Sequence, residues 1–413
     1  MIDIKEKHNC CGCGACVQIC PKQCISMSAD NEGFLYPHVD TSICIDCGLC
    51  EKVCPIINQN EPREPLAVYA AKNTNEEIRI KSSSGGIFTL LAEQVIADSG
   101  VVFGARFNEN WEVIHDYTET VEGLEAFRGS KYVQSIIGDN FKIAKQFLND
   151  GRKVLFSGTP CQIAGLNKFL RKEYDNLLTV EVVCHGVPSP MVWRDYLDYK
   201  RAERAAGKNT VSSSLNELPV ITGISFRDKT NGWKKFGFKI CYAASKAAEN
   251  SVSKYANTAN CEITPFNEDL FMKGFLMNIY LRPSCYHCAA RRGKSGADIS
   301  IADFWGVQNF YHEFDDDKGV GLILVNSRKG EKAYNTVNVQ NIEATYEQGI
   351  KNNPCLEKSV AIPKFRNHFW GSDSVKVEER IVNTLAKMKP NSLTRSYIFI
   401  RLRLAKLIRM ILR

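Results

Sequence analysis

The chain has 413 residues, 44% hydrophobic and 24% charged, which predicts a folded protein of two or three domains with a sizeable core. Its net charge is +7, but eight of its 53 Lys and Arg residues lie in residues 387–413, a stretch without acidic residues. The other 45 nearly balance the 46 Asp and Glu residues, so the body is neutral and we expect no nucleic-acid partner.

The sequence holds 17 cysteines, far more than packing requires. Residues 1–6 lack the apolar segment of a secretory signal, so we expect a cytoplasmic protein. In a reducing compartment, many cysteines indicate metal sites and not disulfides. No run of 18 apolar residues occurs, so we also expect no membrane-spanning helix.

Residues 1–60 contain the spacing Cys-x2-Cys-x2-Cys-x3-Cys-Pro twice. Bacterial ferredoxins have this pattern, in which three cysteines bind one 4Fe-4S cluster and the fourth binds the other. Cluster one would be bound by Cys10, Cys13, Cys16 and Cys54. Cluster two would be bound by Cys44, Cys47, Cys50 and Cys20. Structural zinc and a disulfide frame are the alternatives, but two full copies favour an α+β ferredoxin-like domain that transfers electrons.

Two cysteines of this domain lie outside the pattern. Cys24 precedes an apolar pair, and we interpret it as a core residue. Cys11 has no partner at a recognisable spacing, and we interpret it as a bystander.

Residues 61–150 form the first part of a predicted α/β body, after a polar linker at residues 58–65. A strand is expected at residues 67–71, and a loop at residues 81–86 opens a helix at residues 87–97. Free N–H groups and the helix dipole at such a loop suit phosphate or another anion. Its candidate residues are Ser83, Ser84, Gly85 and Gly86. Ordinary capping and turn roles explain this loop at least as well when it is taken by itself.

A second polar loop spans residues 128–135, after a strand pair expected at residues 101–107 and 111–117 and before a helix at residues 139–149. It combines a cation, an aromatic ring and hydrogen-bonding groups, with the candidate residues Gly129, Lys131, Tyr132 and Gln134. Such a loop suits a planar ring and its phosphates, although many surface loops have a similar composition.

Residues 151–375 form the second part of the body, where strands and helices alternate. Strands at residues 154–156 and 178–183 are each followed by a helix, which favours a parallel sheet. Cys161 and Cys184 follow these strands and are expected at the same edge, where open α/β sheets bind ligands.

Cys285 and Cys288 form a further Cys-x2-Cys pair, which fits zinc, iron–sulfur or thiol redox chemistry. The pair needs two more ligands, and Cys161 and Cys184 are the best placed. Three cysteines have no companion spacing and are left without a role: Cys241, Cys261 and Cys355.

Residues 224–227 and 236–240 alternate as antiparallel strands do. Arg227 and Trp233 in this hairpin could face a cofactor, but pairing with an acid or covering the core explains them better. The polar segments 207–219 and 245–262 on either side are expected to be surface loops.

A final strand at residues 319–325 and a helix at residues 328–339 are expected to complete the same layer. Residues 376–413 form a helical basic tail, beginning with the amphipathic helix of residues 375–388. Residues 397–413 have apolar and basic side chains on opposite helix faces, which suits an anionic membrane surface. Docking on a partner or on the protein's own body explains this helix equally well.

In this order, the motifs resemble one family, the beta subunit of coenzyme F(420) hydrogenases and dehydrogenases, here fused to a two-cluster ferredoxin. The resemblance rests on the ferredoxin run, the Cys285/Cys288 pair and the segments 81–86, 129–135, 158–162, 184–189 and 297–306. It covers residues 10–330 and not the basic tail.

The resemblance implies an iron–sulfur flavoprotein with FAD, held by the loops at residues 81–86 and 129–134. It also implies a third 4Fe-4S cluster near the flavin, and we assign to it Cys161, Cys184, Cys285 and Cys288. No side chain is a strong acid–base candidate; His185 is the best positioned, although beside a ligand cysteine it could simply orient that cysteine.

Three candidate functions follow from this interpretation. The first is an oxidoreductase whose flavin acts on a small-molecule or glycan substrate, for example in surface polysaccharide synthesis at the inner face of the membrane. The second is an electron-relay subunit that serves a separate catalytic partner. The third is a deazaflavin oxidoreductase that uses coenzyme F(420). In each case a redox partner protein or reduced ferredoxin would deliver or accept electrons.

Overall fold

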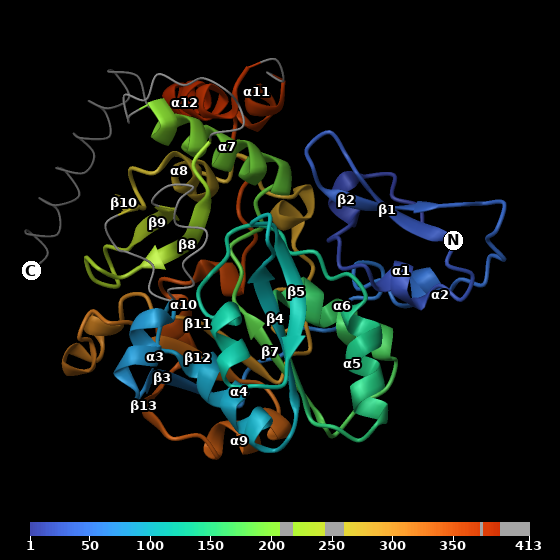
Figure 1. Ribbon diagram of the computed structural model, residues 1–413. Helices are drawn as coiled ribbons and strands as arrows, with labels where there is room; N and C mark the ends of the chain where they lie inside the picture. Colours follow the sequence, from blue (N-terminus) through green and yellow to red (C-terminus); the bar gives the residue numbers. More distant parts are fainter. Residues whose placement is uncertain (207–217, 244–259, 372–374, 389–413) are drawn as a thin grey trace, which may run out of the picture.

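The computed structural model describes residues 1–206, 218–243, 260–371 and 375–388, and Figure 1 shows a ferredoxin-like N-terminal region beside a mixed α/β body. The helices are α1 (Ala15–Ile19), α2 (Leu49–Lys52), α3 (Glu76–Lys81), α4 (Ile87–Ala97), α5 (Asn140–Asn149), α6 (Pro160–Leu170), α7 (Pro190–Ala206), α8 (Leu270–Leu276), α9 (Arg328–Asn335), α10 (Tyr346–Ile350), α11 (Arg366–Trp370) and α12 (Val377–Met388). The strands are β1 (Ile25–Ala29), β2 (Leu35–Val39), β3 (Ala67–Asn73), β4 (Val101–Phe107), β5 (Val113–Thr118), β6 (Val154–Gly158), β7 (Leu177–Val182), β8 (Ile221–Asp228), β9 (Gly237–Tyr242), β10 (Cys261–Pro265), β11 (Ile299–Asp303), β12 (Gly321–Val325) and β13 (Val339–Ala344). The predicted basic helix at residues 397–413 lies outside the described residues, as does most of both polar segments.

An eight-stranded sheet forms the centre of the body, with the strand order β13-β3-β12-β11-β7-β6-β4-β5. Its middle strands β11, β7, β6 and β4 are parallel, and antiparallel strands extend it at both sides. The predicted parallel pair β6 and β7 and the antiparallel pair β4 and β5 are therefore confirmed. Strands from both sides of residue 150 join in this one sheet.

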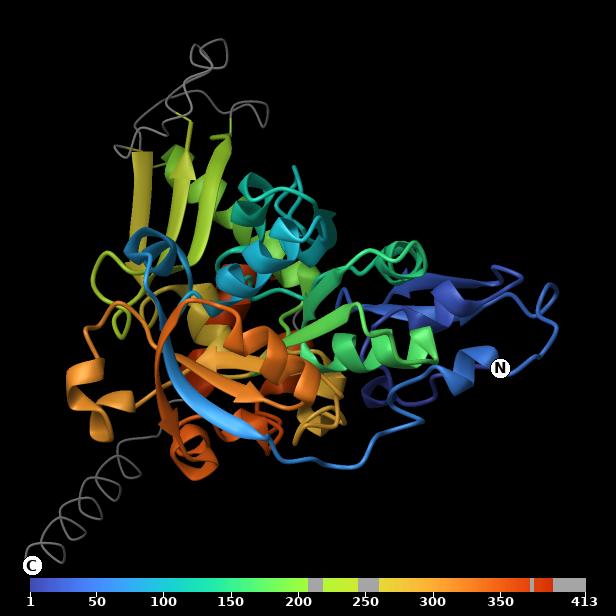
Figure 2. The same ribbon diagram turned by 90° about the horizontal axis from the view of Figure 1, so that it is seen from below.

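Helices cover both faces of the sheet, which explains the nearly continuous apolar character of its middle strands. On one face, α5 and α6 pack against alternate strand residues such as Phe103 and Phe156. On the other face, α4 and α9 pack against the intervening strand residues, such as Val102 and Leu155. Figures 1 and 2 show these helix layers on either side of the sheet.

A second sheet, in the order β10-β9-β8, packs with α7, α8 and α12 around a separate apolar core. The predicted strands at residues 224–227 and 236–240 correspond to β8 and β9, although β9 begins at Gly237, and they are antiparallel, as expected. Trp193 of α7 and Phe226 of β8 lie at the centre of this core, and both are buried.

Two expectations from the sequence are wrong. Helix α9 ends at Asn335, and Val339 begins β13, which pairs antiparallel with β3 as an edge strand. Cysteines were expected to serve metal sites and not disulfides, but Cys241 and Cys261, which the sequence left without a role, form a disulfide. The register of β9 and β10 places these two residues directly opposite each other, so the pairing of the strands brings the two sulfurs together.

The N-terminal region docks on α5 and α6, at one side of the body (Figures 1 and 2). Ala15 and Val53 of this region are buried in the same core as α5 and α6. The carboxamide oxygen of Gln18 accepts hydrogen bonds from the backbone N–H groups of Phe141 and Lys142, at 3.0 and 3.1 Å. In the described part of the chain, no helix has both the length and the apolar character needed to cross a membrane.

Candidate metal centres and flavin loops

The four cysteines predicted to bind cluster two line one pocket: Cys20, Cys44, Cys47 and Cys50. Gly14 and Gly48 cap the short helices α1 and α2 in the left-handed conformation, with φ of 73° and 70°, so each cysteine loop turns tightly into its helix. The Cys50 sulfur accepts a hydrogen bond from the Ile2 N–H at 3.2 Å. This arrangement fits a cluster held by thiolates.

Three of the predicted cluster-one cysteines lie close enough to affect one another's protonation. Burial, together with the charges of Cys10 and Cys54, raises the pKa of Cys16 to about 12. Burial, and then the charges of Cys10 and Cys50, also raises the pKa of Cys54. Buried thiols that disfavour each other's thiolate form are stabilised as thiolates by bound iron, so this set also fits.

The fourth, Cys13, makes its closest contacts with the body. It is buried in the core formed by α5 and α6. A Cβ atom on Gly165 of α6 would lie 2.8 Å from the Cys13 Cβ and 2.9 Å from its sulfur. The cluster-one loop is therefore seated directly on α6.

The four cysteines assigned to a third cluster converge from three parts of the body. Cys161 lies in the first turn of α6, and Cys184 follows β7 at the same sheet edge, as expected. Cys285 lies in the 3-10 helix Pro283–His287, and Cys288 caps it. Burial first, and then the charges of Cys161 and Cys288 among other effects, raises the pKa of Cys285 to about 12. Burial and the charge of Cys161 likewise raise the pKa of Cys288.

In the described residues, no group of three or more His, Cys, Asp or Glu side chains converges tightly enough to hold a single metal ion.

Cys11, to which the spacing assigns no role, lies between the cluster-one loop and the third cysteine set. It is buried beside Cys13 and packs in one core with Cys161. A hydrogen bond to Cys11, followed by burial, raises the pKa of Cys161 well above its ordinary value. The Cys11 thiol is therefore a direct link between the two sets, and no sequence pattern indicates it because Cys161 is 150 positions away. Cys24 is buried, as predicted.

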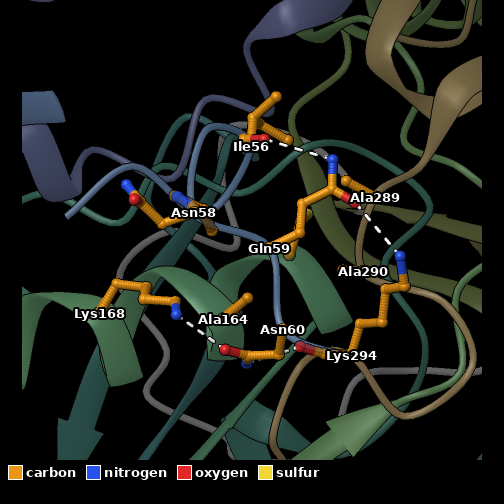
Figure 3. Close-up of a pocket in the computed structure, with 11 residues that line it drawn as sticks. Ile56, Asn58, Gln59, Asn60, Ala164, Lys168, Ala289, Ala290 and Lys294 are labelled. Atoms are coloured by element: carbon orange, nitrogen blue, oxygen red, sulfur yellow. Dashed lines mark hydrogen bonds between the residues drawn. The ribbon is translucent and has the colours of Figure 1, made fainter. Parts of the chain in front are cut away.

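A small pocket marks the junction of the N-terminal region with the body (Figure 3), and Cys161 is one of its lining residues. Figure 3 shows Lys168 of α6 reaching Asn60, with 2.7 Å between the amino nitrogen and the Asn60 carboxamide oxygen. Lys294 approaches Gln59 from the opposite wall, at 3.3 Å. These contacts fix the end of the ferredoxin-like region next to the third cysteine set.

The two loops predicted to contact flavin meet in the structure. The Ser130 N–H and hydroxyl both bond to the Ser83 hydroxyl oxygen, at 2.6 and 2.8 Å. Packing also explains why residue 85 is a glycine, because a Cβ atom there would lie 2.3 Å from the Ala71 carbonyl oxygen. Gly129 has a φ of +81° and open space around it, so its backbone is free for a ligand to approach.

Two lysines of this region are held in carbonyl cages. The Lys131 amino group donates to the carbonyls of Phe127, Arg128 and Gly129, at 3.0 to 3.3 Å. Burial lowers the pKa of Lys131 to about 7, while the three acceptors favour the charged form. Burial, and then the charge of Arg227, lowers the pKa of Lys229 to about 7.

Arg227 connects both loops, and the prediction that it pairs with an acid is confirmed. Its guanidinium donates to both carboxylate oxygens of Asp303, at 2.8 and 3.0 Å, and to the Tyr132 hydroxyl at 3.1 Å. It also donates to the Ser83 carbonyl. Trp233 is buried, and its indole N–H donates to Asp303, which fits its expected role in the core.

The second loop also reaches the cysteine sets. The Gln134 carboxamide donates to the Cys11 carbonyl at 3.1 Å. Tyr132 stacks on Phe275 with 4.7 Å between ring centroids, and Phe275 meets the edge of His185 at 5.2 Å. His185 follows Cys184 directly but bonds to the Asn278 carboxamide oxygen at 2.6 Å, and burial lowers the pKa of its imidazole.

A ferredoxin-like region with two cysteine sets, docked on an α/β body with a third, defines an iron–sulfur electron-transfer protein. Residues 9–56 match the 4Fe-4S dicluster domain. Residues 151–348 match the family described as the C terminus of the coenzyme F(420) hydrogenase/dehydrogenase beta subunit. The chain thus contains the C-terminal domain of that beta-subunit family, preceded by a 4Fe-4S dicluster domain, and the predicted resemblance is confirmed.

One solved structure similar to this chain is titled as a xenon derivative of the F(420)-reducing NiFe hydrogenase complex from Methanosarcina barkeri. It shares 15% sequence identity over 78% of this chain and 91% of that chain, with a TM-score of 0.42. That likeness is too weak to support a conclusion. No curated protein matches the chain significantly.

Proposed function

We propose that this protein is an iron–sulfur flavoprotein oxidoreductase with two ferredoxin-type 4Fe-4S clusters, a third 4Fe-4S cluster and FAD. Clusters exchange single electrons, and a flavin exchanges two electrons with a substrate, so together they connect a one-electron donor to two-electron chemistry. The residues that would hold the clusters are the three cysteine sets described above. The residues that would hold the flavin are Ser83, Ser84, Gly85, Gly86, Gly129, Lys131, Tyr132 and Gln134.

The observation that carries this proposal is the position of the loop at residues 128–135. At one end Ser130 bonds to Ser83, and at the other end Gln134 bonds to the backbone of Cys11. Cys11 in turn contacts Cys161 of the third set. A single loop therefore borders the flavin loop, the cluster-one loop and the third cysteine set.

Cys47 of cluster two is exposed, whereas Cys13 of cluster one is buried against the body and the four cysteines of the third set are half-buried. Cys11 interacts with both Cys13 and Cys161, so it lies between cluster one and the third set. These positions support an order that runs from cluster two, through cluster one and the third cluster, to the flavin.

Anaerobic purification with iron, sulfide and flavin quantified per chain tests the proposal. Three 4Fe-4S clusters require about twelve irons, and we expect them together with one FAD. A content of about eight irons per chain would refute the third cluster. A protein that holds no flavin after reconstitution with FAD would refute the flavoprotein assignment.

The electron-relay function is favoured by exposed apolar residues beside the exposed Cys47. Ile43 and Ile45 in this loop are 49% and 58% exposed, and such residues suit contact with a partner protein. Reduction of the flavin by reduced ferredoxin, followed by turnover of a hydride acceptor by the purified chain alone, would favour the oxidoreductase. Reduction without turnover until a second protein is added would favour the relay. Turnover of coenzyme F(420) itself would identify the deazaflavin enzyme.

For the substrate we propose a small molecule or lipid-linked glycan, in surface polysaccharide synthesis. The support is the basic amphipathic pattern of residues 397–413, which would hold the protein at the inner face of the membrane. Binding to anionic vesicles should be lost when residues 391–413 are removed. Equal binding by the shortened protein would refute the membrane contact.

A further inference from the structure

Arg282 occupies an unusual place between the cluster-one loop and the third cysteine set. It lies three positions before Cys285 and is 1% exposed, although it carries a charge. Its guanidinium reaches into the N-terminal region, where it donates to the Cys10 carbonyl at 2.8 Å and the Leu35 carbonyl at 2.9 Å. One of its nitrogens lies 3.5 Å from the Cys10 sulfur.

In the described part of the chain, the hydrogen-bond partners of Arg282 are carbonyl oxygens, a carboxamide oxygen and a cysteine sulfur, with no carboxylate among them. The Gln134 carboxamide oxygen accepts a hydrogen bond at 3.0 Å, and the Tyr36 ring lies 4.3 Å from the guanidinium carbon. Among the ion pairs between described residues, none joins Arg282 to Asp or Glu. A buried charge without a counter-charge is strongly unfavourable, so the position of Arg282 calls for a nearby negative group.

The cysteine sets on either side provide that negative group when they hold iron. Thiolate-ligated clusters carry negative charge, and their potentials depend on charge and on hydrogen bonds to the sulfurs. Arg282 contacts Cys10 of cluster one through the carbonyl oxygen and the sulfur, and it lies three positions before Cys285 of the third set. It is therefore a fixed positive charge between two predicted clusters.

We propose that the fixed positive charge of Arg282 raises the reduction potential of cluster one. The gained electron adds negative charge to the cluster, and a nearby guanidinium favours the reduced form without any bond being made or broken. The inference rests on the proposed function, because it requires cluster one to be bound through Cys10.

The test is a potentiometric titration, followed by electron paramagnetic resonance, of the full-length protein with its clusters, using dithionite as reductant. Arg282→Met should disfavour reduction of cluster one at least tenfold, which is about 59 mV for a one-electron couple. Cluster two should be unaffected, and Arg282→Lys should restore most of the shift because it keeps the charge. An unchanged cluster-one potential in Arg282→Met would overturn the inference.

A matched control separates the effect of the Arg282 charge from the effect of weaker docking between the N-terminal region and the body. Arg366 is a second buried arginine that crosses the same junction, but it pairs with the Glu32 carboxylate and contacts no cysteine sulfur. Arg366→Met should loosen the junction but leave the equilibrium constant for reduction of cluster one within twofold of the wild-type value. An equal shift in both variants would mean that loosening is the cause and would overturn the inference.

A second variant keeps the test decisive if Arg282→Met does not fold. Gln134→Glu places a carboxylate at the Arg282 guanidinium, so the charge is compensated while the arginine remains, and cluster-one reduction should again become less favourable. No shift in Gln134→Glu would count against the inference. Cys10→Ser identifies the signal of cluster one, because it should abolish that signal. If it abolishes no signal of the wild-type protein, the cluster assignment and the proposed function fail. If it abolishes a signal whose potential does not respond to Arg282, the inference about Arg282 alone fails.

Discussion

Substitution of Gly165 by alanine tests whether the cluster-one loop sits on α6 as closely as the structure indicates. The added methyl group would lie 2.8 Å from the Cys13 Cβ and 2.9 Å from its sulfur. An ordinary contact begins near 3.4 Å, so the helix and the loop must separate by about 0.5 Å or Cys13 must turn away.

The expected stability change combines two opposing effects. Overpacking costs about 1–3 kcal/mol, and replacement of glycine by alanine inside a helix returns about 1 kcal/mol. The net destabilisation should therefore be about 0–2 kcal/mol, measured by urea unfolding. The effect on cluster one should be larger than the effect on stability. Displacement of Cys13, a predicted ligand, should change the electron paramagnetic resonance signal and the iron occupancy of that cluster.

Ile163→Val is a suitable control in the same helix. Ile163 is buried in the core beneath α6, and its truncation costs about 0.5–1.5 kcal/mol without adding an atom beside Cys13. It should destabilise the protein comparably and leave the cluster-one signal unchanged. A Gly165→Ala protein that is more stable than wild type, with an unaltered cluster-one signal, would refute the close packing.

Cys161→Ser should remove the third cluster alone and lower the iron content from about twelve to about eight per chain, whereas Cys355→Ser should not change the iron content. An equal loss of iron in both variants would contradict the ligand set. Glu32→Gln leaves Arg366 without its counter-charge in a largely buried site, with side chains 14% and 11% exposed, and should destabilise the protein by about 3 kcal/mol in urea unfolding. Lys131 has a pKa of about 7 in the folded protein and 10.5 ordinarily, so unfolding takes up a proton between these pH values and stability should rise with pH there. Lys131→Met should reduce that slope by up to about 1.4 kcal/mol per pH unit, and an unchanged slope between pH 7 and 9 would show that the carbonyl cage keeps the lysine charged.

Local patterns in the sequence predicted most of the elements. The paired cysteine spacing, the strand–helix alternation and the glycine-rich turns are all determined within a few residues, and they located β4 to β7 and α4 to α7. The edge strand β13 was missed because half of residues 339–344 are polar, none of the six is buried, and no glycine or proline separates them from α9. The Cys241–Cys261 disulfide was missed because it depends on the pairing of β9 with β10.

The contacts between the N-terminal region and the body were beyond prediction for a different reason. Arg282 and Cys10 are 272 positions apart, and nothing in the spacing of either residue indicates the other. The motif resemblance suggested which loops belong to the flavin site, but it did not indicate that Ser130 bonds to Ser83 or that Gln134 reaches Cys11. Such contacts depend on how two separately recognisable units dock.

The two buried arginines of this junction differ in what compensates their charge. Arg366 meets a carboxylate of the chain itself, so its pairing is complete whether or not iron is bound. Arg282 meets carbonyl oxygens, a carboxamide and a cysteine sulfur, and its charge is compensated only when the cysteines are thiolates. Because iron bound through Cys10 would create those thiolates, we expect assembly of cluster one to stabilise the docked position of the ferredoxin-like region through Arg282. Cluster assembly and docking should therefore be coupled.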